Sequence, residues 1–151
     1  MSWGEIIGWS ATAVGALLGF PQLFRLLRTR NVAGLSLLAW QAVLVLNVIW
    51  FTHGVRIGQG PQIVTNSVAL ASTLPLLVLL ARATRRSVFA VVAPSLVAAA
   101  VIIAVDFTLG SLAFGLVATI PGLMSSSGQS VELVRARRVD VRRPCFHDRH
   151  R

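Results

Sequence analysis

Long apolar runs separated by clusters of arginine are the feature that most constrains this chain. Five runs lie at about residues 6–27, 35–53, 62–81, 88–105 and 109–134. A helix needs roughly 20 residues to cross about 30 Å of hydrocarbon, and each run approaches that length. The runs are continuous rather than alternating in polarity, and they are too long for the strands of a barrel. They predict an all-α membrane protein with about five transmembrane helices.

The composition excludes most soluble classes of protein. Of the 151 residues, 55% are hydrophobic and only 13% are charged, whereas a soluble domain carries about 25% charged residues. The single cysteine, Cys145, excludes an intrachain disulfide. The tail residues Cys145, His147, Asp148 and His150 have no fixed spacing for metal ligands. We therefore expect no metal, no cofactor, no catalytic residue and no enzymatic activity.

The net charge of +9 includes fourteen arginines and no lysine. Three arginines fall in the first connection, three in the third and seven in the tail, whereas the second connection has Arg56 alone. Thirteen therefore lie on one side of a five-span alternation. Because basic residues mark the cytoplasmic side, the N-terminus is predicted outside and the C-terminus in the cytoplasm. The arginines flank apolar runs and form no basic face, so nucleic acid is not an expected partner.

An internal repeat relates the first and fifth apolar runs. A gapless shift of 107 residues aligns Ile6–Val32 with Ala113–Val139, and nine of the 27 positions are identical. The identities reach into the polar flank, where both copies have a glutamine followed by an Arg-x-Arg run. A second copy that directly followed three spans would cross the membrane in the opposite direction to the first copy. A fourth span between the two copies gives both the same orientation. The repeat stops after Val139, so the second copy contains only one helix.

These patterns divide the chain into four parts. Residues 1–84 are predicted to form a three-helix unit, and residues 85–107 a linker transmembrane helix. Residues 108–140 are predicted to form the first helix of an incomplete second repeat, and residues 141–151 a cytoplasmic tail. The chain is thus too long for one three-helix unit and too short for two.

The three-helix unit carries an ordered set of motifs. Pro21-Gln22-Leu23 is followed by Arg28-Thr29-Arg30-Asn31 and Gly34-Leu35-Ser36. This set resembles the signature of the PQ-loop (MtN3/saliva) family, and most of all that of the SemiSWEET and SWEET sugar transporters. Trp50, Gly54, Asn66 and Pro75 stand where bacterial SemiSWEETs have the same residue types. The resemblance covers about residues 6–81.

The resemblance implies facilitative, bidirectional transport of mono- or disaccharides by alternating access. It also implies a multi-pass protein of a bacterial cell (plasma) membrane, which pairs as a homodimer or with a second PQ-loop unit. Trp50 and Asn66 are implied to contact the sugar. An apolar ring face and an amide that both donates and accepts are groups that suit a sugar. Asn47, three residues before Trp50, is a second candidate for the cavity wall. By themselves, such residues also fit an interfacial tryptophan and an asparagine that bonds a neighbouring helix.

Hinge and gate residues complete the predicted site. Pro21 and Pro75 each remove a hydrogen bond inside a helix and permit a kink, although membrane helices also tolerate proline without any mechanism. The resemblance implies that Pro21 is a hinge, and Gln22 is predicted to face the bundle because lipid would not satisfy its amide. His53 and Arg56 are predicted to form an outer gate. SemiSWEETs often have an acid near this second connection, whereas the stretch here contains none.

Two other functions stay open. A proton-coupled amino-acid transporter of the wider PQ-loop group would need an acid at mid-depth, and the first three runs have none there. A truncated, non-transporting membrane assembly partner would account for a second repeat of only one helix. One tryptophan and one asparagine define a class of ligand and do not identify the sugar.

Overall fold

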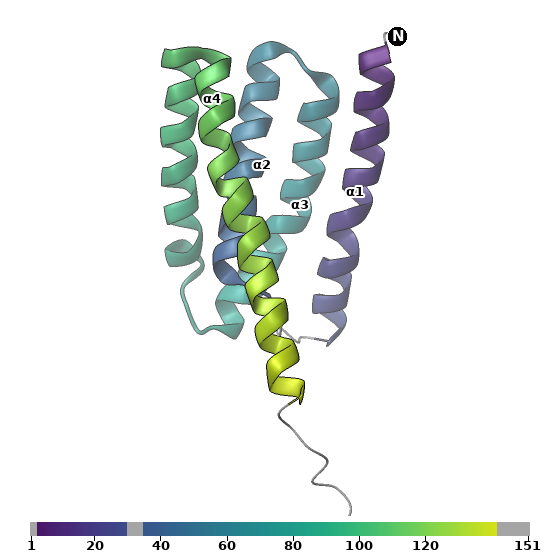
Figure 1. Ribbon diagram of the computed structural model, residues 1–151, viewed down its shortest axis with the longest axis vertical. Helices are drawn as coiled ribbons and strands as arrows, with labels where there is room; N and C mark the ends of the chain where they lie inside the picture. The colour runs from purple at the N-terminus through teal and green to yellow at the C-terminus, as the bar shows by residue number, and fades with distance from the viewer. Residues whose placement is uncertain (1–2, 30–34, 142–151) are drawn as a thin grey trace, which may run out of the picture.

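The computed structural model describes residues 3–29 and 35–141, without the side chains of residues 15–20, 22, 26, 129, 132, 133 and 136–141. Its helices are α1 (Trp3–Thr29), α2 (Leu37–Ile57), α3 (Gly60–Ala83) and α4 (Val88–Val141) (Figure 1). α4 is broken at Gly110, whose φ of 84° and ψ of 175° are not helical. We call residues 88–109 the first arm of α4 and residues 111–141 its second arm. The described chain is therefore all-α with five helices, as predicted.

Local chemistry accounts for the helix ends. The side chain of Ser36 caps α2 by accepting a hydrogen bond from the backbone N–H of Ala39 at 3.3 Å. Gly58 ends α2 in the left-handed conformation, with φ of 70°. Pro61 stands in the first turn of α3, where its missing N–H breaks no helical hydrogen bond. The connection between α2 and α3 is therefore short, with only Gly58 and Gln59 between the two helices.

The helices pack in the order α1, α3, α2, α4. Among the described residues α1 contacts α3 and no other helix, while α2 contacts α3 and α4. Half of the apolar 18-residue stretch of α2 is buried, compared with 28% of that in α3 and 22% of that in α4. α2 is therefore the most buried of these three helices. One core cluster joins α2 to α3 around Leu44 and Leu77. A second joins α2 to both arms of α4 around Ile49, Ile102 and Phe114.

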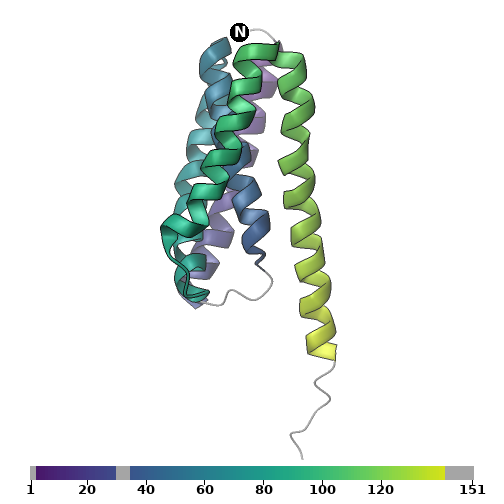
Figure 2. The same ribbon diagram turned by 90° about the vertical axis from the view of Figure 1, so that its left-hand side faces the viewer.

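The chain runs up and down the bundle. In Figures 1 and 2, α1, α3 and the second arm run in one direction, and α2 and the first arm run in the other. The second arm is therefore parallel to α1, which is the orientation that a repeat separated by a linker helix requires. The connection from α3 to α4 and the end of the second arm lie at the same end of the bundle, opposite the start of α1 (Figure 1).

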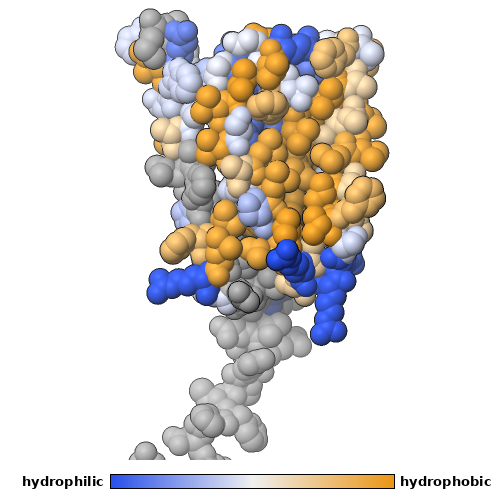
Figure 3. Space-filling view, turned by 180° about the vertical axis from the view of Figure 1, so that it is seen from behind, coloured by the Kyte–Doolittle hydropathy of each residue, from blue (hydrophilic) through white to orange (hydrophobic). Residues whose placement is uncertain are grey.

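Three segments are long and apolar enough to cross a membrane: Leu37–Ile57, Gly60–Ala83 and the 41 residues of Val88–Gly128, which include the break in α4. Large apolar side chains lie on the outside, and Leu112 and Phe89 are 82% and 81% exposed. The middle of the bundle is apolar, and hydrophilic groups gather at its ends (Figure 3). Such a surface is unfavourable in water and suits a bilayer. The chain therefore has the character of a multi-pass membrane protein. Over the described residues α1 is not among the three segments, so a count of five spans stays a prediction.

Candidate functional site

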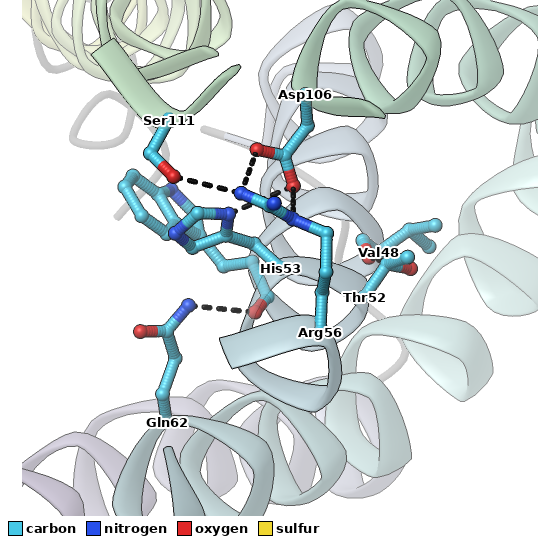
Figure 4. A network of polar contacts seen from close by, with 8 residues as sticks. Val48, Thr52, His53, Arg56, Gln62, Asp106 and Ser111 are labelled. Atoms are coloured by element: carbon cyan, nitrogen blue, oxygen red, sulfur yellow. Dashed lines mark hydrogen bonds and ion pairs between the residues drawn. The ribbon is translucent and has the colours of Figure 1, made fainter. Parts of the chain in front are cut away.

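Four polar side chains from α2 and α4 meet near the turn between the two arms of α4: His53, Arg56, Asp106 and Ser111 (Figure 4). We call them the outer cluster, after the side of the membrane on which the arginine distribution predicts this end of the bundle. Asp106 Oδ2 accepts hydrogen bonds from His53 Nδ1 and Arg56 Nε, both at 2.8 Å, and Asp106 Oδ1 accepts one from Arg56 Nη2 at 2.7 Å. Arg56 Nη2 also donates to Ser111 Oγ at 2.7 Å. Because a carboxylate can only accept, His53 carries a proton on Nδ1 in this arrangement.

The outer cluster depends on the chain reversal at Gly110. His53 and Arg56 are three residues apart in α2 and so lie on one face of that helix. Asp106 lies in the last turn of the first arm and Ser111 begins the second, on either side of Gly110. The backbone of Gly110 occupies a region that is essentially restricted to glycine. This reversal brings both arms against α2 and adds a carboxylate and a hydroxyl to the face that carries the two basic residues.

The three charged or ionisable side chains of the outer cluster differ in how deeply they are buried. The side chains of Asp106 and His53 are only 2% and 8% exposed, whereas that of Arg56 is 29% exposed. The carboxylate is desolvated and depends on its partners, while the guanidinium keeps part of its hydration. The two parallel bonds from Arg56 form a bidentate pair, which is stronger and more directional than a single contact. The outer cluster therefore ties the first arm to the end of α2.

An aromatic layer lies next to the outer cluster. The buried ring of Phe114, from the second arm, stacks on His53 with centroids 4.4 Å apart and planes at 14°. It meets the ring of Trp50 edge-on at 5.1 Å, and Trp50 meets His53 edge-on at 5.8 Å. Offset stacking and edge-to-face contacts are the preferred aromatic geometries. The indole that is predicted to contact sugar is thus half-buried and oriented by the second arm.

Gln62 connects the two predicted sugar contacts. Its side-chain Nε2 donates to the backbone carbonyl of Trp50 at 2.8 Å, and its backbone carbonyl accepts from Asn66 Nδ2 at 2.8 Å. The backbone of Trp50 in α2 and the side chain of Asn66 in α3 are therefore both bonded to Gln62, near the short turn between these helices. Asn66 is half-buried, and one of its amide hydrogens is used within its own helix.

The other predicted site residues have different surroundings. Asn47 is buried, and its Nδ2 donates to Thr73 Oγ1 of α3 at 3.0 Å, so it joins two helices. Pro21 and Pro75 lie inside α1 and α3, and both are exposed. The side chain of Gln22, residues 30–34 and the tail beyond residue 141 lie outside the described residues.

Asp106 is the residue that the sequence analysis left out of the predicted gate. The stretch after His53 offers no acid, and the acid comes instead from α4, 50 residues after Arg56. The fourth run was expected to end at residue 105, whereas the first arm continues to residue 109 and contains Asp106. A charged residue at the edge of a membrane helix needs a partner, and this was the available signal. Within the described residues no group of three or more His, Cys, Asp or Glu could hold a metal.

No family model, curated protein or solved structure matches this chain. The class of protein is therefore defined by the fold itself: an all-α, multi-pass membrane protein with a polar cluster that joins its central helix to the reversal in α4.

Proposed function

We propose that this chain is a facilitative, bidirectional carrier of mono- or disaccharides that works by alternating access, similar to the SemiSWEET and SWEET transporters. The observation that supports this proposal most is that Gln62 bonds to both residues, to the backbone of Trp50 and to the side chain of Asn66, while the ring of Trp50 lies against His53 of the outer cluster. An indole face suits the C–H face of a sugar, and an amide suits its hydroxyl groups.

In this proposal the outer cluster is the gate on the outer side. Alternating access requires a contact that closes one side and can break, and the cluster joins two helices through side chains alone. Arg56, which is partly exposed, is the member that water and substrate reach first. Opening separates Arg56 from Asp106, and Gly110 gives the turn between the arms its freedom to move.

The proposed carrier needs a second unit to enclose a route. The second arm is parallel to α1 and supplies one further helix, which does not complete a second bundle. A second copy of the chain in the same membrane is the proposed partner, so the working form is a homodimer.

Uptake of radiolabelled sugars into proteoliposomes tests the proposal. The unchanged chain should take up at least one mono- or disaccharide faster than empty liposomes do. Trp50→Ala and Asn66→Ala should each reduce uptake by about tenfold, which corresponds to about 1.4 kcal/mol of lost contact. Trp3→Ala is the matched control, because Trp3 is 82% exposed at the start of α1. Uptake that neither site variant reduces would contradict the assignment of the sugar site.

One observation favours a second candidate, a proton-coupled amino-acid transporter. Asp106 is a buried acid at a candidate membrane span, and it is paired with His53. Acids and histidines in such positions occur in proton relays. An imposed proton gradient separates the two functions, because it leaves the rate of a uniporter unchanged and drives accumulation by a coupled carrier. If the unchanged chain transports neither class of substrate, the proposal of an assembly partner takes precedence.

A further inference from the structure

One face of the second arm repeats the face through which α1 packs on α3. The gapless shift of 107 residues pairs Gly8 with Gly115 and Thr12 with Thr119, and both pairs are identical. The two positions are four residues apart in each copy, so they lie on one side of a helix. The contacts of the first copy therefore show what kind of partner such a face takes.

In the first copy this face is buried against a parallel helix. A Cβ atom added to Gly8 would lie 3.2 Å from Cβ and Cγ of Pro61, so a glycine allows this close approach. One turn further on, Thr12 is 7% exposed, and its Oγ1 donates to the Pro61 carbonyl at 3.1 Å and accepts from Thr65 Oγ1 at 2.7 Å. Pro61 and Thr65 are also four residues apart. The two helices thus meet in register, with a bond between two threonine hydroxyls.

In the second copy the same face is open. A Cβ atom added to Gly115 would meet no atom within 4 Å. Thr119 is exposed, and its Oγ1 donates within its own helix, to the carbonyl of Leu116 at 2.7 Å. The second arm packs on α2 through a different side, where Phe114 and Ala118 are buried. Since this part of α4 belongs to a candidate membrane span, the open face lies at bilayer depth.

A second copy of the chain has a surface that matches this face. Two copies carry the same arginines, so they insert in one orientation and their second arms run parallel, as α1 and α3 do (Figure 1). A hydroxyl both donates and accepts, so two facing Thr119 side chains can form the kind of bond that joins Thr12 to Thr65. Facing glycines allow two helices in a bilayer to approach closely. Such a contact is the same on both sides, as a twofold dimer requires.

We propose that Gly115 and Thr119 form the contact between two copies of the chain, second arm against second arm. The choice of a second copy as the partner rests on the homodimer of the proposed function, whereas the contact itself does not depend on what the dimer transports. α3 of another copy is not available to this face, because its Pro61 and Thr65 are covered by α1. The incomplete second repeat is then the part of the chain that holds the dimer together.

Disulfide cross-linking in membranes tests the contact. Cys145→Ser removes the single native cysteine, and one cysteine at a time is then introduced elsewhere. Thr119→Cys and Gly115→Cys place a thiol on the proposed face. Ile120→Cys is the matched control, because Ile120 is 55% exposed on another side of the same helix turn. A disulfide needs Cβ atoms about 3.8 Å apart. Oxidation with copper phenanthroline should therefore cross-link each of the first two variants at least fivefold more than the control, and equal cross-linking of all three would overturn the proposal.

A cysteine in α1 separates this contact from the homodimer itself. Val14 is 60% exposed, so Val14→Cys has a thiol that another copy could reach if the dimer formed through α1. This variant should cross-link no more than the Ile120→Cys control. Cross-linking through Val14 and not through Thr119 would overturn the proposed contact and leave the homodimer of the proposed function standing.

Energy transfer between copies in vesicles gives a second measurement. One half of the protein carries a donor dye on Cys145 and the other half an acceptor dye. Gly115→Leu should reduce the dimer fraction at least fivefold, because the side chain occupies space that is open in the single chain and closed in the dimer. Ala104→Leu adds bulk at an exposed position of the first arm and should leave energy transfer unchanged. Energy transfer that Gly115→Leu does not reduce would overturn the proposal. Sugar uptake by the same vesicles tests the proposed function separately, since a dimer that transports nothing would contradict that function and not this contact.

Discussion

The pair formed by Arg56 and Asp106 should contribute measurably to the stability of the bundle. We expect that replacing both residues by alanine, singly and together, gives a clearly non-additive loss of stability. The reason is that Asp106 is buried in a candidate membrane span and accepts two of its three described hydrogen bonds from Arg56. Removing either residue breaks both of those bonds.

The structure sets the size of the expected effect. Hydrogen bonds to charged groups contribute about 1.5–3 kcal/mol each, but Arg56 is 29% exposed and recovers water when the pair breaks. We therefore expect Arg56→Ala to cost about 2 kcal/mol, because the buried carboxylate keeps only His53. Asp106→Ala should cost about 3 kcal/mol, because it also leaves the buried His53 Nδ1–H without this acceptor. The coupling energy of the pair should be about 2 kcal/mol.

Reversible unfolding in mixed micelles measures this coupling. The fraction of denaturing detergent is increased, and helical circular dichroism gives the free energy of unfolding of each variant. The matched control is the cycle of Asp106→Ala with Arg85→Ala, because Arg85 is exposed and belongs to the connection from α3 to α4, which lies at the opposite end of the bundle (Figure 1). Its coupling should be below about 0.5 kcal/mol. If the coupling of Arg56 with Asp106 were as small as that of the control, the outer cluster could not be a stabilising contact.

Two further predictions use the same unfolding measurement. Gly110→Ala should lower the free energy of unfolding by about 1–3 kcal/mol, because the backbone of Gly110 has φ of 84° and ψ of 175°. Gly122→Ala, at a helical glycine with open space around it, should instead raise the free energy of unfolding by about 0.5–1 kcal/mol. Equal effects of the two substitutions would contradict a special role for the reversal at Gly110. Asn47→Ala should cost about 0.6–1.7 kcal/mol through its lost bond to Thr73. Thr73→Ser keeps the hydroxyl and should cost less than Asn47→Ala, and the opposite order would contradict the importance of this bond.

Much of the fold could be predicted from local properties of the sequence. The apolar runs predicted the helices to within a few residues at most ends, because length and hydropathy are properties of consecutive residues. The exception is instructive. Two helices were expected on either side of residue 107, and the structure has them with only Gly110 between them, so that α4 continues past Asp106. An aspartate normally suggests the end of an apolar segment, and here it lies within the helix with its carboxylate bonded to His53 and Arg56.

The candidate site could be predicted only in part. His53 and Arg56 were predicted to form a gate, and Trp50 and Asn66 to contact a sugar, from the resemblance to the SemiSWEET transporters. The contact of Trp50 with Phe114 and the connection through Gln62 were not predicted, because they depend on how α2 packs against α3 and the second arm.

The sequence by itself determined that this is an all-α chain for a membrane, because long apolar runs cannot remain in water and arginines mark the ends of those runs. Only the tertiary structure decided which polar groups meet. Asp106 lies 50 residues after Arg56, and no local pattern connects them. The reversal at Gly110 and the packing of both arms on α2 bring the carboxylate to its partners. A buried polar group is satisfied by whatever the packing brings to it, so its partner is known only once the helices are in place.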